Sequence, residues 1–264
     1  MSKLSESVSF KRNGFPLLIA CAIATSFVTV SKAQEITRVA TLSKVETSRA
    51  AASKQNKYTF IMFWKNQDDA TKAMWNTLQQ NLSDKKNKTT FVAVNTNDPE
   101  EQNLVKEYGV SRAPMPLTLA IAPNGAITGS FVKNINADYI DQSFVSPAKS
   151  RCMLTLQSRK MVLLCVNPAV KSETPKGVKN FKSIPCYRDV VEVVSVSSLE
   201  SREASFLKEL GVPQQDNNTT VVFMAPPGVM VGRFNGNVTQ QQLIAELKKA
   251  GKSCGVDGCK HCKE

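Results

Sequence analysis

Short unbroken hydrophobic runs alternate with spaced hydrophobic positions along the chain, which predicts strands alternating with helices. The run at 57–64 indicates a buried strand, and a second strand is expected at 90–94. Between them an apolar residue recurs at every fourth position, at Ala70, Met74, Leu78 and Leu82. Such spacing is typical of one face of an amphipathic helix, so we expect this helix to cover the sheet that the strands begin.

A second helix is expected after the second strand, because its start and stop signals are both present. Asp98 can cap the first turn, Pro99 suits the first helical position, and Glu101 completes a capping box. Gly109 can close the helix in the left-handed conformation. Two hydrophobic runs then flank the turn at 123–125 as a hairpin, and a last helix closes the unit. This order implies an α/β fold with a mixed sheet covered by helices.

The same order of elements occurs twice, roughly one hundred residues apart. The segment LVKEYGV at 104–110 recurs as FLKELGV at 206–212, and LTLAIAPNG at 117–125 recurs as TVVFMAPPG at 220–228. Further along each copy, a glycine and a phenylalanine stand two residues apart, at Gly129 and Phe131 and at Gly232 and Phe234. The sequence therefore predicts two domains of one kind.

The order βαβαββα, with YGVSRAPMPLTLAIAPNG at 108–125 before the hairpin, resembles the thioredoxin fold. The resemblance covers most of residues 55–148 and, more weakly, 158–250. In that family the strand before the hairpin begins with a cis-proline, and Pro116 has the matching place, which implies a cis bond from Met115 to Pro116. The resemblance implies two tandem thioredoxin-like domains, each a central mixed β-sheet flanked by helices.

The repeat and the composition of the two ends divide the chain into four expected regions. They are a signal peptide at 1–33, a thioredoxin-like domain at 34–148, a second one at 149–251, and a Cys/His-rich tail at 252–264. The second domain is expected to end at 251, because Thr239 can cap its last helix and Gly251 can end it.

Residues 1–33 have the order of a secretory signal peptide. Lys11 and Arg12 precede the uncharged run 15–30, and small residues end at Ala33. The run is shorter and more polar than the ~18 apolar residues expected of a spanning helix. We therefore expect an exported protein, periplasmic or secreted, without stable membrane insertion after cleavage.

The charge of the chain narrows the expected partners. Its formal net charge is +12, but the basic residues are spread along the sequence. No basic run interleaved with aromatic residues indicates a nucleic-acid groove, so nucleic acid is not an expected partner.

The resemblance also shows which reactive groups the first copy lacks. Thioredoxins carry Trp-Cys-x-x-Cys-Lys after Phe-Trp, whereas here Gln67 takes the tryptophan place, Asp68 and Thr71 take the two cysteine places, and Lys72 matches the lysine. Thiol–disulfide exchange needs a thiolate and a second sulfur, so no catalytic residue is expected at the usual site. Asp68 and Asp69 are instead expected to cap and complement the helix.

The second copy departs further from the motif. The aligned positions are Val170, Lys171, Ser172 and Glu173, and Thr219 holds the cis-proline place.

Cysteines elsewhere have several possible roles. Cys165 lies in a hydrophobic run and is expected to fill the core. Cys152 and Cys186 flank this run and could form a disulfide in an exported chain.

Three cysteines and the only histidine lie close together in the tail, at Cys254, Cys259, His261 and Cys262. As metal ligands these side chains could hold zinc or Cu(I). Cys259 and Cys262 also form a C-x-x-C pair that could exchange thiols, although the chain is too short here for a following helix to lower their pKa. The third possibility is a flexible tail with a plain disulfide and one free or intermolecular thiol.

The sequence favours a non-catalytic protein that binds a polypeptide or another protein partner. The resemblance places the binding groove beside the cis-proline, where an extended peptide can pair with the main chain. The expected groove residues are Trp64, Gln67, Asp68, Met115 and Pro116, whereas Trp75 is expected in the core. The alternative is a thiol–disulfide oxidoreductase or a metal-binding protein that acts through its tail.

Overall fold

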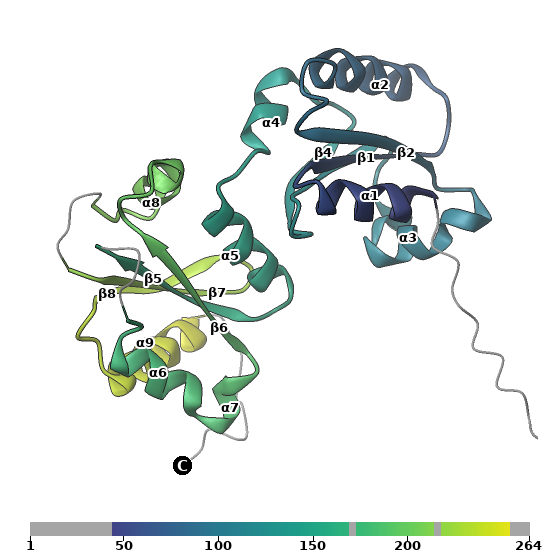
Figure 1. Cartoon of the computed structure of the whole chain (residues 1–264). Coiled ribbons are helices and arrows are strands. Elements are labelled where there is room, and N and C mark those ends of the chain that lie inside the picture. The colour runs from purple at the N-terminus through teal and green to yellow at the C-terminus, as the bar shows by residue number, and fades with distance from the viewer. Residues whose placement is uncertain (1–43, 169–172, 214–217, 254–264) are drawn as a thin grey trace, which may run out of the picture. The chain divides into compact units, whose positions relative to one another are not determined.

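The computed structural model describes residues 44–168, 173–213 and 218–253, which contain two mixed four-stranded sheets (Figure 1). The first sheet has the order β2-β1-β3-β4, with β1 at Tyr58–Trp64, β2 at Thr89–Asn95, β3 at Leu117–Ile121 and β4 at Ile127–Val132. Strand β1 pairs parallel with β2 and antiparallel with β3, and β3 pairs antiparallel with β4. The predicted strands at 57–64 and 90–94 and the predicted hairpin are confirmed.

Helices cover both faces of the first sheet, as Figure 1 shows. They are α1 at Lys44–Lys54, α2 at Asp69–Leu82, α3 at Gln102–Glu107 and α4 at Ala137–Gln142. Helices α1 and α3 bury Val45 and Leu104 in one cluster, whereas α2 and α4 bury Leu78 and Ile140 in another on the opposite face. The β1 side chains alternate between these clusters, since Phe63 belongs to the first and Met62 to the second.

The second sheet repeats this plan with the order β6-β5-β7-β8. Its strands are β5 at Met161–Asn167, β6 at Val191–Ser197, β7 at Thr220–Ala225 and β8 at Val229–Asn235. Its helices are α5 at Pro147–Gln157, α6 at Lys176–Ser183, α7 at Pro185–Arg188, α8 at Ala204–Glu209 and α9 at Gln240–Ser253. Helices α5 and α8 pack on one face, and α6, α7 and α9 pack on the other.

Each domain begins with a helix that the sequence pattern did not predict. Helix α1 has the sequence KVETSRAAASK and buries only Val45 and Ala52, so it lacks a recognisable apolar stripe. Helix α5 begins at Pro147, two residues before the start predicted for the second domain. The full order in each copy is therefore a helix followed by the predicted βαβαββα.

The predicted stripe of α2 is confirmed at Met74, Leu78 and Leu82, but Ala70 is exposed. Helix α2 begins at Asp69, so Ala70 lies in its first turn, where Thr71 is the buried residue. The closing helix α9 also differs at its end, because it continues past Gly251 to Ser253. Gly251 does not have a positive φ, so it does not end the helix in the left-handed conformation.

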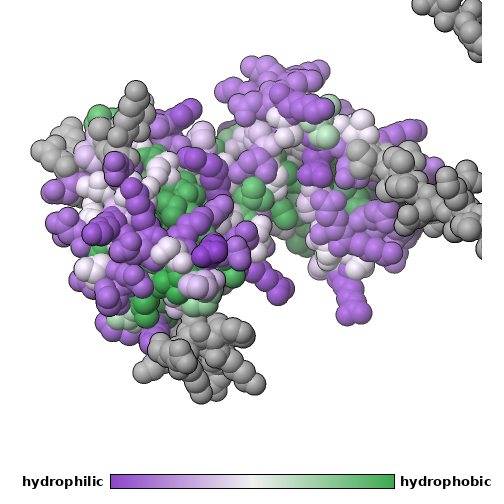
Figure 2. Space-filling view, turned by 60° about the horizontal axis from the view of Figure 1, so that its bottom comes forward, coloured by the Kyte–Doolittle hydropathy of each residue, from purple (hydrophilic) through white to green (hydrophobic). Residues whose placement is uncertain are grey.

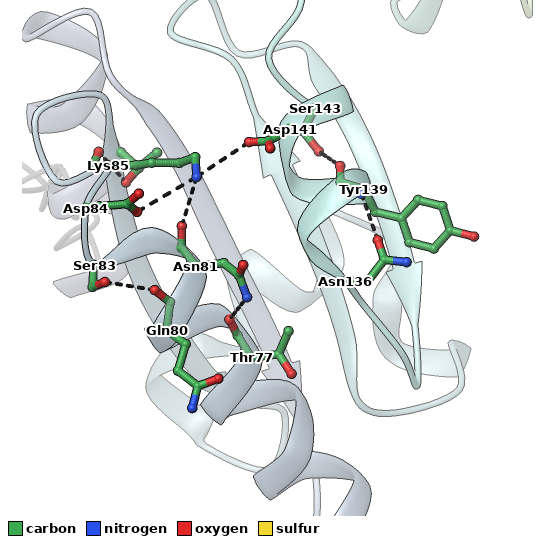
Figure 3. Close-up of polar contacts among 11 residues, drawn as sticks. Thr77, Gln80, Asn81, Ser83, Asp84, Lys85, Asn136, Tyr139, Asp141 and Ser143 are labelled. Carbon is green, nitrogen blue, oxygen red and sulfur yellow. Dashed lines mark hydrogen bonds and ion pairs between the residues drawn. The ribbon is translucent and has the colours of Figure 1, made fainter.

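Polar contacts join the end of α2 to α4 on the face that both helices cover (Figure 3). The Lys85 Nζ lies 3.5 Å from Asp141 Oδ1 and donates a hydrogen bond to the Asn81 carbonyl oxygen at 3.3 Å. An exposed ion pair of this kind contributes about 0–1 kcal/mol. Burial of one leucine or isoleucine side chain contributes about 1.5–3 kcal/mol, so Leu78 and Ile140 hold this face together more strongly.

The recurring glycine and phenylalanine have a structural explanation on the edge strands β4 and β8. A Cβ placed on Gly232 would lie 2.7 Å from the ring of Phe234, and a Cβ on Gly129 would clash with Phe131 in the same way. Each phenylalanine ring therefore lies over the glycine two residues before it, on the same face of the strand. The pairing of each hairpin also shifts register, between Ala120 and Ile121 in the first copy and between Phe223 and Met224 in the second.

Candidate functional site

The turn between β1 and α2 ends in a helix cap. Asp68 is the N-cap of α2, and its Oδ1 accepts a hydrogen bond from the Thr71 backbone N–H at 2.8 Å. Hydrogen bonds from Thr71 hold the pKa of the Asp68 carboxyl below its ordinary value. Asp69 opens the helix, with its Oδ1 3.9 Å from the Lys72 Nζ. The predicted capping role of Asp68 is confirmed, and its carboxylate occupies the helix end where thioredoxins carry a thiolate.

The proline of the expected groove has the predicted geometry, because the bond from Met115 to Pro116 is cis. A second cis bond joins Pro226 to Pro227, which the sequence did not predict. Pro116 is buried, its carbonyl oxygen accepts a hydrogen bond from the Lys133 N–H at 2.8 Å, and Met115 packs against the cluster shared with α1 and α3.

A cavity of about 750 Å³ opens beside the turn, at the carboxyl ends of β1 and β2. Its walls come from these strands, from the first half of α2 and from the segment after β2: Met62, Trp64, Gln67, Thr71, Lys72, Trp75, Asn76, Ala93, Asn95, Asp98 and Glu101. Trp64 and Gln67 of the expected groove therefore line this cavity, whereas Asp68, Met115 and Pro116 are outside its lining. Volumes of 300–1,000 Å³ are typical of ligand pockets.

Trp75 is a wall of the cavity and not the core residue that the sequence suggested. The residue is 38% exposed, and its ring centroid lies 4.9 Å from that of Phe91. The position of Trp75 on α2 explains the difference. Met74 and Leu78 face the sheet, so Trp75, one residue after Met74, lies to the side of that face, toward the edge strand β2.

Glu101 is a buried carboxylate in the same wall. The residue is 9% exposed, and its Oε2 has no hydrogen-bond partner. The predicted capping box, in which Glu101 would accept from the Asp98 N–H, does not form. That N–H already donates to the Asn95 carbonyl oxygen at 3.0 Å, and the Asp98 side chain caps through the Glu100 N–H at 2.9 Å.

The corresponding place in the second domain has different chemistry. Glu203 has the same position in its copy, is 1% exposed and also has an Oε2 without a hydrogen-bond partner, but its Oε1 accepts a hydrogen bond from the Ala148 N–H at 3.0 Å. Asn167 ends β5 where Trp64 ends β1, and it accepts a hydrogen bond from the Thr219 hydroxyl at 3.2 Å. Thr219 stands at the cis-proline place.

A smaller hollow of about 390 Å³ lies beside Thr219 and has mostly polar walls: Glu173, Pro175, Asn218, Thr219, Asn235, Gly236 and Asn237. Of the other positions aligned with the motif, Val170, Lys171 and Ser172 lie outside the described residues. The aromatic cavity is thus a feature of the first domain.

Cysteines of the described residues lie in helices and strands away from the cavity. Cys165 is fully buried in β5, as predicted, and burial raises the pKa of its thiol to about 12. Burial likewise raises the pKa of the Cys152 thiol to about 12. The predicted disulfide from Cys152 to Cys186 is wrong, because Cys152 is a free thiol in α5 and Cys186 lies in α7 on the opposite face of the sheet.

The tail residues Cys254, Cys259, His261 and Cys262 lie outside the described residues, so the predicted metal or thiol site there stays a prediction. Across 44–168, 173–213 and 218–253, no group of three or more metal-binding side chains comes together. Within the same ranges, the helices are all too short or too polar to cross a membrane.

Neither a protein-family model nor a curated protein matches the chain. Among solved structures, the C-terminal domain of Neisseria meningitidis DsbD in the reduced form is similar, with a TM-score of 0.30 and 21% identity over 38% of this chain and 90% of that one. The zinc-bound form of human ERp44 has a TM-score of 0.33 and 11% identity over 76% of this chain and 57% of that one. The first two thioredoxin domains of Saccharomyces cerevisiae Eps1p have a TM-score of 0.26 and 14% identity over 72% and 88%.

At these scores the fold is assigned from the topology of the chain itself. Each copy has a parallel β–α–β unit, then a crossover to an antiparallel hairpin, with helices on both faces. Strand order, connections and the internal repeat agree in the two copies. The chain is a tandem thioredoxin-fold protein with two thioredoxin-like domains, each a mixed β-sheet flanked by helices.

Proposed function

We propose that this protein is exported and binds an extended polypeptide non-catalytically at the carboxyl end of the first sheet. The observation that carries the proposal is the cavity of about 750 Å³ beside a turn whose thioredoxin cysteine places hold Asp68 and Thr71. Asp68 serves as the cap of α2, so this end of the domain retains a pocket and lacks a nucleophilic thiol.

The proposed binding surface joins the cavity to the neighbouring groove. Trp64 and Gln67 line the cavity, and we place the rest of the surface at Asp68 and at Met115, which precedes the buried cis-proline Pro116 and the start of β3. Large aromatic side chains supply much of the binding energy of protein interfaces, and Trp64 and Trp75 line the cavity together. Export is supported by the signal-peptide pattern of residues 1–33.

The test uses the purified full-length mature chain and a fluorescently labelled, reduced and carboxymethylated polypeptide as the probe. We expect saturable binding by fluorescence anisotropy, lost in Met115→Asn and retained in Val229→Asn, which changes an exposed residue of the second domain. A chain without residues 254–264 should bind as the wild type does, because α9 remains whole up to Ser253.

The opposite pattern would overturn the proposal. If removal of residues 254–264 abolished binding while Met115→Asn did not, the function would lie in the tail. Zinc or copper bound to the full chain and lost with the tail would then identify metal binding. A reducible disulfide in the tail would instead identify thiol exchange.

A further inference from the structure

The cavity in the first domain combines aromatic walls with an excess of carboxylate. Trp64 and Trp75 supply the aromatic surface, and Asp98 and Glu101 supply two carboxylates against the single ammonium of Lys72. The Lys72 side chain is 66% exposed, and its Nζ lies 3.9 Å from Asp69 on the solvent side of α2. The lining therefore favours a cation over an anion.

Glu101 provides an independent reason to expect a ligand that donates hydrogen bonds. Its Oε2 is buried and has no partner, in a residue that is 9% exposed and lines the cavity. A buried acceptor without a donor costs about 1–3 kcal/mol, and more when it is charged. In the second domain, Glu203 at the same position also has a buried Oε2 without a partner, but its Oε1 accepts from the Ala148 N–H of α5 and the residue is outside the lining of the hollow beside Thr219. The first copy thus keeps the buried carboxylate but places it in the wall of an open cavity.

We propose that this cavity binds the guanidinium group of an arginine side chain on the bound polypeptide. A guanidinium is planar, stacks on indole rings, and donates paired hydrogen bonds to a carboxylate. Trp64 and Trp75 offer the aromatic faces, and the Glu101 carboxylate in the cavity wall offers the acceptor. A lysine ammonium would satisfy the charge but offers neither the planar face nor the paired donors.

This assignment rests on the proposed function for its polypeptide and adds the side chain that the polypeptide must carry. The experiment compares two otherwise identical extended peptides, one with arginine and one with citrulline, which has nearly the same shape but no charge. Binding to the full-length mature chain is followed by the fluorescence of Trp64 and Trp75, the two tryptophans of the protein.

We expect the wild type to bind the arginine peptide about tenfold more tightly than the citrulline peptide, the scale expected for a desolvated cation–π contact with a charged hydrogen bond. Glu101→Gln keeps the shape of the side chain and should reduce this preference to less than about twofold. Glu203→Gln is the matched control in the second domain and should leave the preference unchanged.

The outcomes separate the two proposals. Equal binding of both peptides to the wild type would overturn the arginine assignment and leave polypeptide binding intact. Failure of both peptides and of the carboxymethylated polypeptide to bind would overturn the proposed function as well. If Glu101→Gln does not fold, the exposed Trp75→Leu replaces it, with Tyr139→Leu on α4 as its control, and an unchanged preference in Trp75→Leu would count against the assignment.

Discussion

Two helical glycines of the second domain should respond in opposite ways to the same substitution. In Gly177→Ala the new Cβ would overlap the Val238 carbonyl oxygen and lie 3.0 Å from the Thr239 Cα. These atoms are backbone at the entry to α9, and Val238 is buried with Leu243, so no side chain can turn aside. In Gly251→Ala nothing lies within 4 Å of the new Cβ.

The expected magnitude follows from two opposing effects. Alanine in place of glycine inside a helix stabilises by about 1 kcal/mol. Helix α6 and the entry to α9 would have to separate by about 1 Å to restore ordinary carbon–carbon spacing of 3.5–4.0 Å. Overpacking of this kind costs about 1–3 kcal/mol, and rigid backbone places Gly177→Ala at the upper end, which leaves a net loss of about 2 kcal/mol. Gly251→Ala should be neutral or stabilising by up to about 1 kcal/mol.

The two sheets can be followed separately in one urea titration of the full chain. Both tryptophans belong to the first domain, so tryptophan fluorescence reports its unfolding, whereas far-ultraviolet circular dichroism reports both domains. We expect Gly177→Ala to lower the circular dichroism transition of the second domain and leave the fluorescence transition in place. A Gly177→Ala chain as stable as the wild type would refute the close approach of α6 to Val238.

Three further predictions concern the polar and titratable groups. The Tyr58 hydroxyl donates to the Val145 carbonyl oxygen at 2.9 Å and accepts from the Val145 N–H at 3.1 Å. Tyr58→Phe removes both hydrogen bonds and should destabilise the first domain by about 1–3 kcal/mol, measured from the fluorescence transition. A loss under about 0.5 kcal/mol would contradict this prediction. Burial raises the pKa of Cys152 and Cys165 from 9.0 to about 12, so these two thiols should resist iodoacetamide in the native chain at pH 8, and fast alkylation of either one, located by peptide mass spectrometry, would argue against it. Stability should fall as pH rises above 9, because there these two thiols ionise only in the unfolded chain. The pKa of Asp68 is lowered from 3.8, so its ionised form stabilises the fold above pH 4 and this contribution is lost as pH falls. Asp68→Ala should therefore lower the Tm at pH 7, and the difference in Tm from the wild type should disappear in acid.

The fold could be predicted from the sequence because its signals are local and occur twice. The hydrophobic run of β1 and the left-handed Gly109 both have the predicted conformation, and Gly109 has φ of 63°. Helix α1 could not be predicted in this way, since it is held by only two buried residues. A helix with so little apolar surface owes its position to the sheet that it covers.

The candidate site was less accessible to prediction, because its residues depend on tertiary placement. The capping pattern suggested that Glu101 would bond the Asp98 N–H, but the preceding Asn95 carbonyl had already taken that donor. Trp75 was expected inside because large aromatic residues usually are, and only the edge position of β2 explains its exposure. The one available signal was the pair of tryptophans either side of the turn, which places two indoles near one end of the sheet.

The two hairpins have a consequence for the behaviour of this chain at high concentration. Two open sheets present four strand edges, and a flat edge can recruit a strand from another molecule and start aggregation. In β4 and β8 the register shift increases local twist, and a phenylalanine ring lies over a glycine of the same strand. Both features make these edges poor templates for a neighbouring chain. The duplicated irregularity thus protects each sheet against unwanted self-assembly along one side.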